Sequence, residues 1–276
     1  MLGSPHRGMV DGPRGLADDR AMSVSLREVV GHLDATLEID RFRDYAPNGL
    51  QVEGTTDVEC VVTGVSASAE LIGAAIERRA DLIVVHHGLI WGDGLSRIAG
   101  PLARRLRLLL GNEVSLAAYH LPLDKHPRLG NNAGLCDALG LGAGRESFGD
   151  VRGTLLGVAA AWPAPVSRDD AIARIADAVG KSPFVFPHGP AAVRKVGVCS
   201  GAASDLLEAA AAAGCDLFLT GELAERAGDL AKELQITLVA AGHYATEVFG
   251  PLRIADELRQ RFPGLDVQFV AAPSPL

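Results

Sequence analysis

The segment Ala80-Asp-Leu-Ile-Val-Val-His-His-Gly-Leu-Ile-Trp91 indicates how the rest of the chain is organised. Residues 82–85 form a short, β-branched, apolar run, as expected for a strand that is buried on both faces. His86 and His87 then fall at the carboxyl end of this strand, the edge where open α/β sheets bind ligands. Because side chains alternate along a strand, the pair favours two neighbouring ions, or one ion if the chain turns at Gly88. The alternative is a pair of capping or core histidines.

Composition limits the class of protein and its partners. The chain has 276 residues and 48% hydrophobic content, enough for two closely packed lobes with a substantial core. Its net charge of −8 argues against general binding to nucleic acid or anionic membranes, so we expect a small-molecule substrate or protein partners. The sequence has no apolar run of about 18 residues and no signal-peptide pattern, which predicts a cytoplasmic location. No Cys-x-x-Cys pair occurs, so reduced thiols are expected.

The first part of the chain predicts an α/β arrangement. Residues 1–22 are rich in glycine and charge with almost no apolar periodicity, and we interpret them as a disordered N-terminal extension. Ser25-Leu-Arg-Glu28 is a capping box that begins an amphipathic helix. A strand over residues 60–66, a helix over about 68–79 and the His-His strand then form a strand-helix-strand unit, which implies a parallel sheet.

The next elements bring further polar residues to strand ends. A leucine-rich helix over residues 101–110 and a buried strand over 113–119 lead to His120-Leu-Pro-Leu-Asp124. Residues 131–195 form a middle α/β segment in which no catalytic cluster is visible. It contains a predicted strand over 154–162 and a helix capped by Ser167.

An internal repeat links the two ends of the chain. The pattern of residues 196–222 copies that of 60–87 and aligns Gly221-Glu222 with His86-His87. Further along, His243-x-x-x-Glu247 aligns with His120-x-x-x-Asp124. We therefore expect residues 23–130 and 196–276 to form duplicated metal-binding α/β halves. Small-residue turns beginning at Gly64 and Gly201 each lead into a helix, and either hold a phosphate or only allow close packing.

The strand ends of both halves could face one cleft. Imidazole and carboxylate ligands without thiolate suit zinc, iron, manganese, cobalt or nickel, whereas calcium alone is disfavoured. One tetrahedral ion cannot use so many ligands, but two ions that share a carboxylate can. A bound ion lowers the pKa of its water towards about 7, so metal-assisted hydrolysis is the natural reaction class. The candidate residues are His86, His87, His120, Asp124, Glu222, His243 and Glu247.

Five motifs together resemble those of the Nif-three-like dinuclear metal protein family, whose members are often labelled GTP cyclohydrolase I type 2 homologues. The resemblance covers roughly residues 23–276. The motifs are Asn48-Gly-Leu-Gln-Val52, His86-His-Gly-Leu-Ile-Trp91, His120-Leu-Pro-Leu-Asp-Lys-His-Pro-Arg-Leu-Gly-Asn-Asn132, Thr220-Gly-Glu222 and Gly242-His-Tyr-Ala-Thr-Glu247.

The resemblance implies two intertwined, duplicated α/β lobes, a two-metal site between them, and a toroidal homohexamer whose sites face an internal cavity. The chain has His-Leu-Pro-Leu-Asp where many relatives have His-Thr-x-Leu-Asp, a change that leaves the aspartate intact. The short middle segment implies that the extra domain of longer relatives is absent. The metal ligands of the family match His86, His87, Asp124, His243 and Glu247, and His120 and Glu222 match positions near the metals and are candidates for proton transfer.

Two functions from different classes follow from this sequence. The first is a dinuclear metal-dependent hydrolase that acts on a small nucleotide-like or phosphorylated substrate, with GTP cyclohydrolase chemistry as the family label suggests. The second is a non-catalytic metal-binding hexameric scaffold, a metal store or a delivery protein. A ring that encloses DNA is a third hypothesis, which the acidic charge of the chain opposes.

Overall fold

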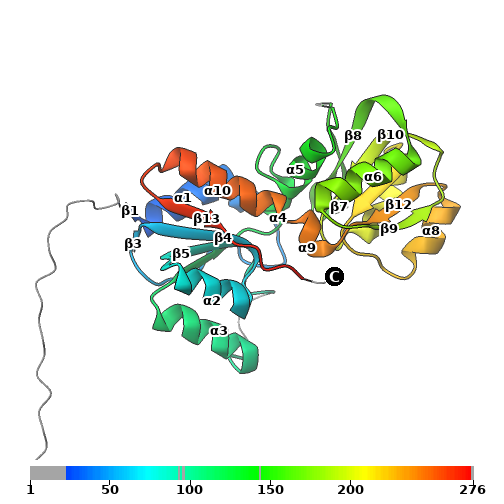
Figure 1. Ribbon diagram of the computed structural model, residues 1–276. Helices are drawn as coiled ribbons and strands as arrows, with labels where there is room; N and C mark the ends of the chain where they lie inside the picture. The colour runs from blue at the N-terminus through cyan, green and yellow to red at the C-terminus, as the bar shows by residue number, and fades with distance from the viewer. Residues whose placement is uncertain (1–22, 93, 95–96, 143, 275–276) are drawn as a thin grey trace, which may run out of the picture.

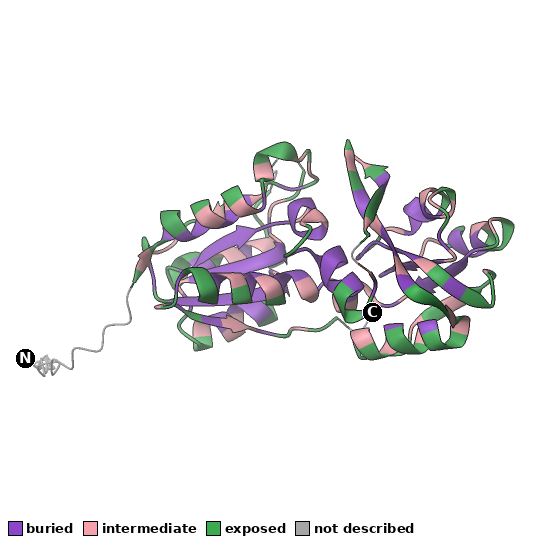
Figure 2. Ribbon diagram, turned by 90° about the horizontal axis from the view of Figure 1, so that it is seen from above, coloured by how far each residue is buried: buried purple, intermediate pink, exposed green. Residues whose placement is uncertain are grey.

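The computed structural model describes residues 23–92, 94, 97–142 and 144–274, so the predicted N-terminal extension lies outside the described residues. The fold is α/β and consists of two lobes side by side, each built on one sheet with helices on both faces (Figure 1). In each lobe the buried residues gather on the strands and on the helix faces turned towards them (Figure 2). The predicted fold class is confirmed.

The first lobe contains a five-stranded sheet whose β5 (Leu82–His87) is central and buried on both faces, as predicted. Leu82 and Val84 belong to the core cluster formed with α1 (Leu26–Thr36) and α10 (Phe249–Arg261). Ile83 and Val85 face the opposite cluster, with α2 (Ala69–Glu77) and α3 (Gly100–Gly111). Four strands are parallel, and the last is antiparallel to its neighbour. The strand order is β13 (Asp266–Phe269), β4 (Cys60–Ser66), β5, β6 (Ser115–Ala118) and β2 (Gly49–Val52).

The second lobe contains a six-stranded sheet with a parallel centre and antiparallel flanks. Its order is β7 (Glu146–Val151), β8 (Thr154–Ser167), β10 (Ala192–Val198), β11 (Leu217–Thr220), β12 (Thr237–Ala240) and β9 (Phe184–Pro187). One face packs against α5 (Asn131–Ala138) and α6 (Arg168–Val179), the other against α7 (Leu207–Ala212) and α8 (Ala227–Glu233). The parallel strands β10-β11-β12 match β4-β5-β6 in arrangement, which is consistent with the expected duplication.

Short elements and helix caps complete the two lobes. The strands β1 (Val24–Ser25) and β3 (Asp57–Val58) pair with each other, and η1 (Ile39–Arg41) and η2 (Ser204–Leu206) are single 3₁₀ turns. The Oγ of Ser25 accepts the backbone N–H of Glu28, and the Oγ of Ser167 accepts that of Asp170. These bonds satisfy N–H groups that a helix leaves free, and they confirm both predicted caps.

The chain crosses between the lobes twice. It leaves the first lobe through α4 (Leu121–Lys125) and returns through α9 (His243–Thr246), so that β13 pairs with β4 in the first sheet. The middle segment, residues 131–195, shares the second sheet with the strands that follow it, because β8 pairs with β10 and β9 pairs with β12. Residues 249–269 belong to the first lobe because they complete its core and its sheet.

Two further expectations concern thiols and membranes. All four cysteines are buried free thiols, and burial raises the pKa of Cys60 and of Cys136 to about 11. Within the described part of the chain, no helix combines the length and the apolar character that a membrane crossing requires.

Candidate metal centre

Six of the seven predicted side chains converge where the chain crosses between the lobes. His86 and His87 are the last two residues of β5, His120 directly precedes α4, and Glu247 directly follows α9. The possible ligand atoms form three overlapping groups, and within each group they lie within 4.8 Å of one another. The groups are His86, His87 and His120; His87, His243 and Glu247; and His86, Asp124 and Glu247.

Glu247 lies at the centre of this cluster and is 2% exposed. Its Oε1 is 3.0 Å from the Nε2 of His243 and 3.4 Å from the Nε2 of His86. Its Oε2 is 3.4 Å from the Nε2 of His87. The helical turn of α9 brings His243 and Glu247 to one face, as their spacing predicts. Because Glu247 is shared by two of the groups, it is placed to contact two neighbouring cations.

Each of the four histidines is held through its Nδ1, which leaves its Nε2 for the cluster. A ring nitrogen that faces a carbonyl or carboxylate oxygen must carry the hydrogen, and this fixes the tautomers of His86, His120 and His243. Such outer partners orient the histidines of metal sites. The Nδ1 contacts are His86 with the carbonyl of Tyr119 (2.9 Å), His87 with the Oγ of Ser66 (3.0 Å), His120 with Asp44 (2.7 Å) and His243 with Glu222 (2.7 Å).

The buried atoms of the cluster require a positive charge. The Nε2 of His86 and the Oε2 of Glu247 are buried and have no hydrogen-bond partner among the described residues. Since the Nδ1–H of His86 is donated to a carbonyl, a neutral ring points its Nε2 lone pair at the Oδ1 of Asp124 (3.5 Å) and at Glu247. This arrangement is repulsive unless a proton or a metal cation lies between the atoms. The donor set therefore fits a divalent metal.

The pKa values show how strongly these groups interact. Burial alone would lower the pKa of His86, but the carboxylates of Asp124 and Glu247 raise it to about 10. Burial alone would raise the pKa of Glu247, but the charge of His86 and the hydrogen bond of His243 hold it well below its usual range. Burial and the charge of His86 together lower the pKa of His87 to about 3. The neutral ring of His87 is thus in the form that binds a metal.

Asp124 is fixed by residues of the second lobe. Its Oδ1 accepts hydrogen bonds from the Nδ2 of Asn131 (2.9 Å) and from the Oγ of Ser200 (3.0 Å). The backbone N–H of Ser200 in turn donates to the Oδ1 of Asn132 (2.8 Å). The Asn131-Asn132 pair at the start of α5 therefore holds the carboxylate in place.

Glu222 lies outside the three groups. Its side chain is 48% exposed and its Oε1 accepts the Nδ1–H of His243, so it positions that histidine. His120 is closer to the cluster than Glu222, since it shares a group with His86 and His87.

Sequence reasoning did not single out Asp44 or Ser66, which hold two of the rings. The side chain of Asp44 is 3% exposed and also accepts hydrogen bonds from the backbone N–H of Leu121 and from the Nδ2 of Asn48. No local pattern connects Asp44 with His120, which is 76 residues away. The nearest signal is the Asn48-Gly49 motif, since the Oδ1 of Asn48 accepts the backbone N–H of His120.

A cavity of about 370 Å³ gives access to the cluster. His87, His243 and Glu247 contribute to its wall, as do Glu222 and Tyr244. A volume of this size is within the range of small-molecule sites.

Comparison with known proteins identifies the family. Residues 24–275 match the model of the family described as DUF34/NIF3 (NGG1p interacting factor 3). This chain belongs to the DUF34/NIF3 family. A GTP cyclohydrolase 1 type 2 homolog from Pseudomonas aeruginosa is 40% identical over 256 residues, which cover 92% of this chain and 100% of that protein. The family predicted from the five motifs is thus confirmed.

Two solved structures share the fold of this DUF34/NIF3 chain. The protein ybgI, of unknown function, has a TM-score of 0.84 at 36% sequence identity, covering 92% of this chain and 100% of its own. The protein TTHA1606 from Thermus thermophilus has a TM-score of 0.82 at 35% identity, with the same coverage. Both likenesses extend over nearly all described residues, so they include both lobes and the junction between them.

Proposed function

We propose that this DUF34/NIF3 protein binds two divalent metal ions and hydrolyses a small nucleotide-like or phosphorylated molecule. The observation that carries the proposal is the sharing of Glu247 by two groups of possible ligands. His86 and Asp124 complete one group, and His87 and His243 complete the other. The cavity over His87 and His243 supports access by a small molecule.

The two groups suggest how the ligands divide between the ions. His86, Asp124 and Glu247 would hold one ion, and His87, His243 and Glu247 would hold the other. Zinc, iron, manganese, cobalt and nickel all suit imidazole and carboxylate ligands.

The remaining residues would orient the ligands and move protons. When bound, the ions would supply Lewis acidity and lower the pKa of water at neutral pH. Glu222 keeps the ring of His243 in one orientation through its Oε1, and it also lines the cavity. Its carboxylate would accept a proton from a reacting molecule. His120, held by Asp44, is the second candidate for proton transfer.

A non-catalytic metal store or scaffold is the second candidate function. In His86, His87 and His243, the Nδ1 contacts the residue that orients the ring, and the Nε2 faces the carboxylate of Glu247. This arrangement favours retention of ions and leaves few groups free for proton transfer. It predicts bound metal without turnover.

Metal content and hydrolysis measured on the same samples test the first proposal. We would compare wild type with His86→Ala and Glu247→Gln by elemental analysis, and assay GTP, cyclic phosphodiesters and phosphomonoesters. His188→Ala is the matched control, because His188 is exposed and belongs to none of the three groups. We expect about two ions per wild-type chain, as in two-metal hydrolases, and loss of ions and of hydrolysis in the two cluster variants only.

Other results have distinct meanings. Two ions without hydrolysis of any substrate would favour the store or scaffold. Wild-type protein that holds no specific metal after reconstitution would contradict both functions. The toroidal homohexamer implied by the family resemblance stays a prediction, which light scattering coupled to size-exclusion chromatography tests.

A further inference from the structure

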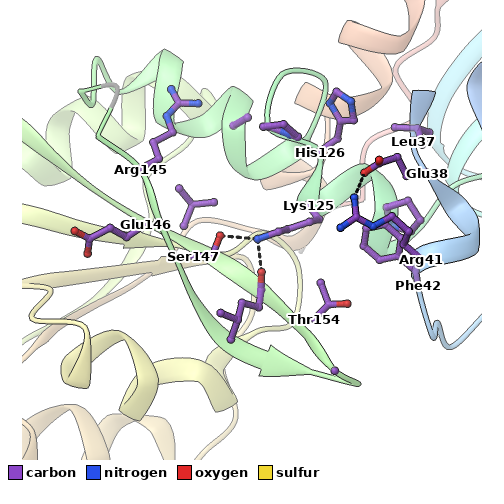
Figure 3. Close-up of a pocket in the computed structure, with 16 residues that line it drawn as sticks. Leu37, Glu38, Arg41, Phe42, Lys125, His126, Arg145, Glu146, Ser147 and Thr154 are labelled. Carbon is purple, nitrogen blue, oxygen red and sulfur yellow. Dashed lines mark hydrogen bonds and ion pairs between the residues drawn. The ribbon is translucent and has the colours of Figure 1, made fainter. Parts of the chain in front are cut away.

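A second cavity, of about 550 Å³, lies at the junction of the lobes. Leu37 and Phe42 line it from the first lobe, and Ser147 and Leu155 line it from the β7-β8 hairpin of the second lobe (Figure 3). Lys125, at the end of α4, also lines it. None of the three groups of possible metal ligands includes a residue that lines this cavity.

The charges around this cavity are balanced except at one position. Lys125 donates hydrogen bonds from its Nζ to the Oγ of Ser147 (2.6 Å) and to the carbonyl of Leu155, both neutral acceptors (Figure 3). Among the charged lining residues that the structure describes, it is the one without an oppositely charged partner. The others are paired: Arg41 with Glu38, Glu146 with Lys195, and Arg145 with Asp137.

Apolar side chains form another part of the wall. Leu37, Phe42, Pro122, Leu155 and Val158 are among the lining residues. A cavity of this volume holds a small organic molecule. Apolar side chains together with a single uncompensated cation favour a ligand with an apolar body and an anionic head, because an anion replaces the water that the cation loses.

We propose that this cavity binds a small amphipathic anion, with a carboxylate, phosphate or sulfonate head at Lys125 and an apolar body against Phe42 and Leu155. The ligand would contact both lobes at once. The site is separate from the metal cluster, and the proposal does not depend on hydrolysis.

A pair of fluorescent probes that differ in charge tests this site. Anilinonaphthalene sulfonate is an amphipathic monoanion, and phenylnaphthylamine has the same rings without the sulfonate. Each would be titrated against the full-length, metal-loaded protein. The variants are Lys125→Met, which keeps an apolar side chain of similar length, and Lys125→Arg, which keeps the charge. Lys232→Met is the control, since Lys232 is exposed on α8 and lines neither this cavity nor the cavity beside the metal cluster.

The expected result is a loss of affinity that depends on both charges. Lys125→Met should weaken binding of the sulfonate by about tenfold or more, because a charge-assisted contact is lost. Lys125→Arg and Lys232→Met should bind it within about twofold of wild type, and none of the variants should change binding of phenylnaphthylamine. Circular dichroism establishes that Lys125→Met is folded. Equal sulfonate affinity in wild type and folded Lys125→Met would overturn the proposal, as would a wild-type protein that does not bind the sulfonate.

Competition then identifies the head group. Hexanoate and hexyl phosphate share an apolar chain and differ in their anionic end, so the better displacer of the dye shows which head Lys125 prefers. Displacement by either supports the site. If neither displaces the dye, the dye binds elsewhere and the proposal fails.

Discussion

Gly201 shows how closely the backbone surrounds the metal cluster. A Cβ atom at this position would lie 2.3 Å from the Oε1 of Glu247 and 3.3 Å from the Nε2 of His243. Its φ of +65° also disfavours other residues. The small-residue turn that the sequence suggested for phosphate binding or close packing thus provides room for a carboxylate.

Gly201→Ala should therefore displace Glu247 and reduce bound metal. Gly140→Ala is the matched control, because Gly140 has the same φ of +65° but nothing within 4 Å of its Cβ position. Both variants should lose about 1 kcal/mol of stability from the backbone conformation. Elemental analysis should show loss of metal in Gly201→Ala alone. Equal metal content in the two variants would show that Glu247 is not a ligand or can move freely.

Asp44 should matter for metal affinity although it is in none of the ligand groups. Asp44→Ala removes the acceptor that fixes the ring of His120, which shares a group of possible metal ligands with His86 and His87. Loss of a partner that orients a ligating histidine weakens metal binding by about 10–100-fold. Competition with a chromophoric chelator measures this affinity. The exposed Asp40, only four residues earlier, provides the control Asp40→Ala, which should bind metal like wild type.

At the scale of elements, local patterns predicted more than long-range pairings. The apolar run of β5, the capping serines of α1 and α6, and the turn of α9 were predicted because each is determined by neighbouring residues. The pairing of β13 with β4 was not predicted, because it joins segments that are distant in the sequence. The same limit applies to the site. Sequence motifs indicated the clustered residues but not Asp44, which is distant from His120 in the sequence and contacts it only in the folded chain.

Glu257 joins elements of the first lobe in a way that depends on pH. It lies on α10 and accepts hydrogen bonds from Arg128 (2.7 Å) and from His32 of α1 (3.1 Å). Burial tends to raise the pKa of Glu257, but these two partners lower it. A lowered pKa means that the ionised carboxylate stabilises the folded state above the unfolded pKa of about 4.3, and that this contribution is lost as the pH falls through the folded pKa.

Glu257→Gln should consequently reduce the free energy of unfolding by about 1 kcal/mol at neutral pH, since the contacts are partly screened. The difference from wild type should shrink at acidic pH, as the pH falls below the unfolded pKa of about 4.3 and through the lower pKa of the folded carboxylate. Urea unfolding at both pH values measures this difference in the free energy of unfolding. Glu77→Gln, at the exposed end of α2, should change little at either pH, and a loss in Glu257→Gln that is independent of pH would contradict the explanation.

At the scale of the molecule, the cluster ties together the two crossings of the chain. His120 and Asp124 belong to the first crossing, and His243 and Glu247 belong to the second. Metal should therefore stabilise both lobes, by about 2.7 kcal/mol when free metal is 100 times Kd. Removal of metal by a chelator should lower the Tm in calorimetry. In Glu247→Gln the Tm should not respond to added zinc, and a wild-type Tm insensitive to metal would contradict this prediction.

The return of the chain to its first lobe also affects its synthesis. A ribosome releases β4, β5 and β6 before the sheet of the second lobe, whereas α10 and β13, which complete the first lobe, follow that sheet. A nascent chain therefore has an unpaired edge on β4, and its histidines at the end of β5 lack Glu247, until the second sheet has been made. Domains synthesised in one uninterrupted segment can fold as they emerge. In this protein the first lobe can be completed only after the strands of the second lobe have been synthesised.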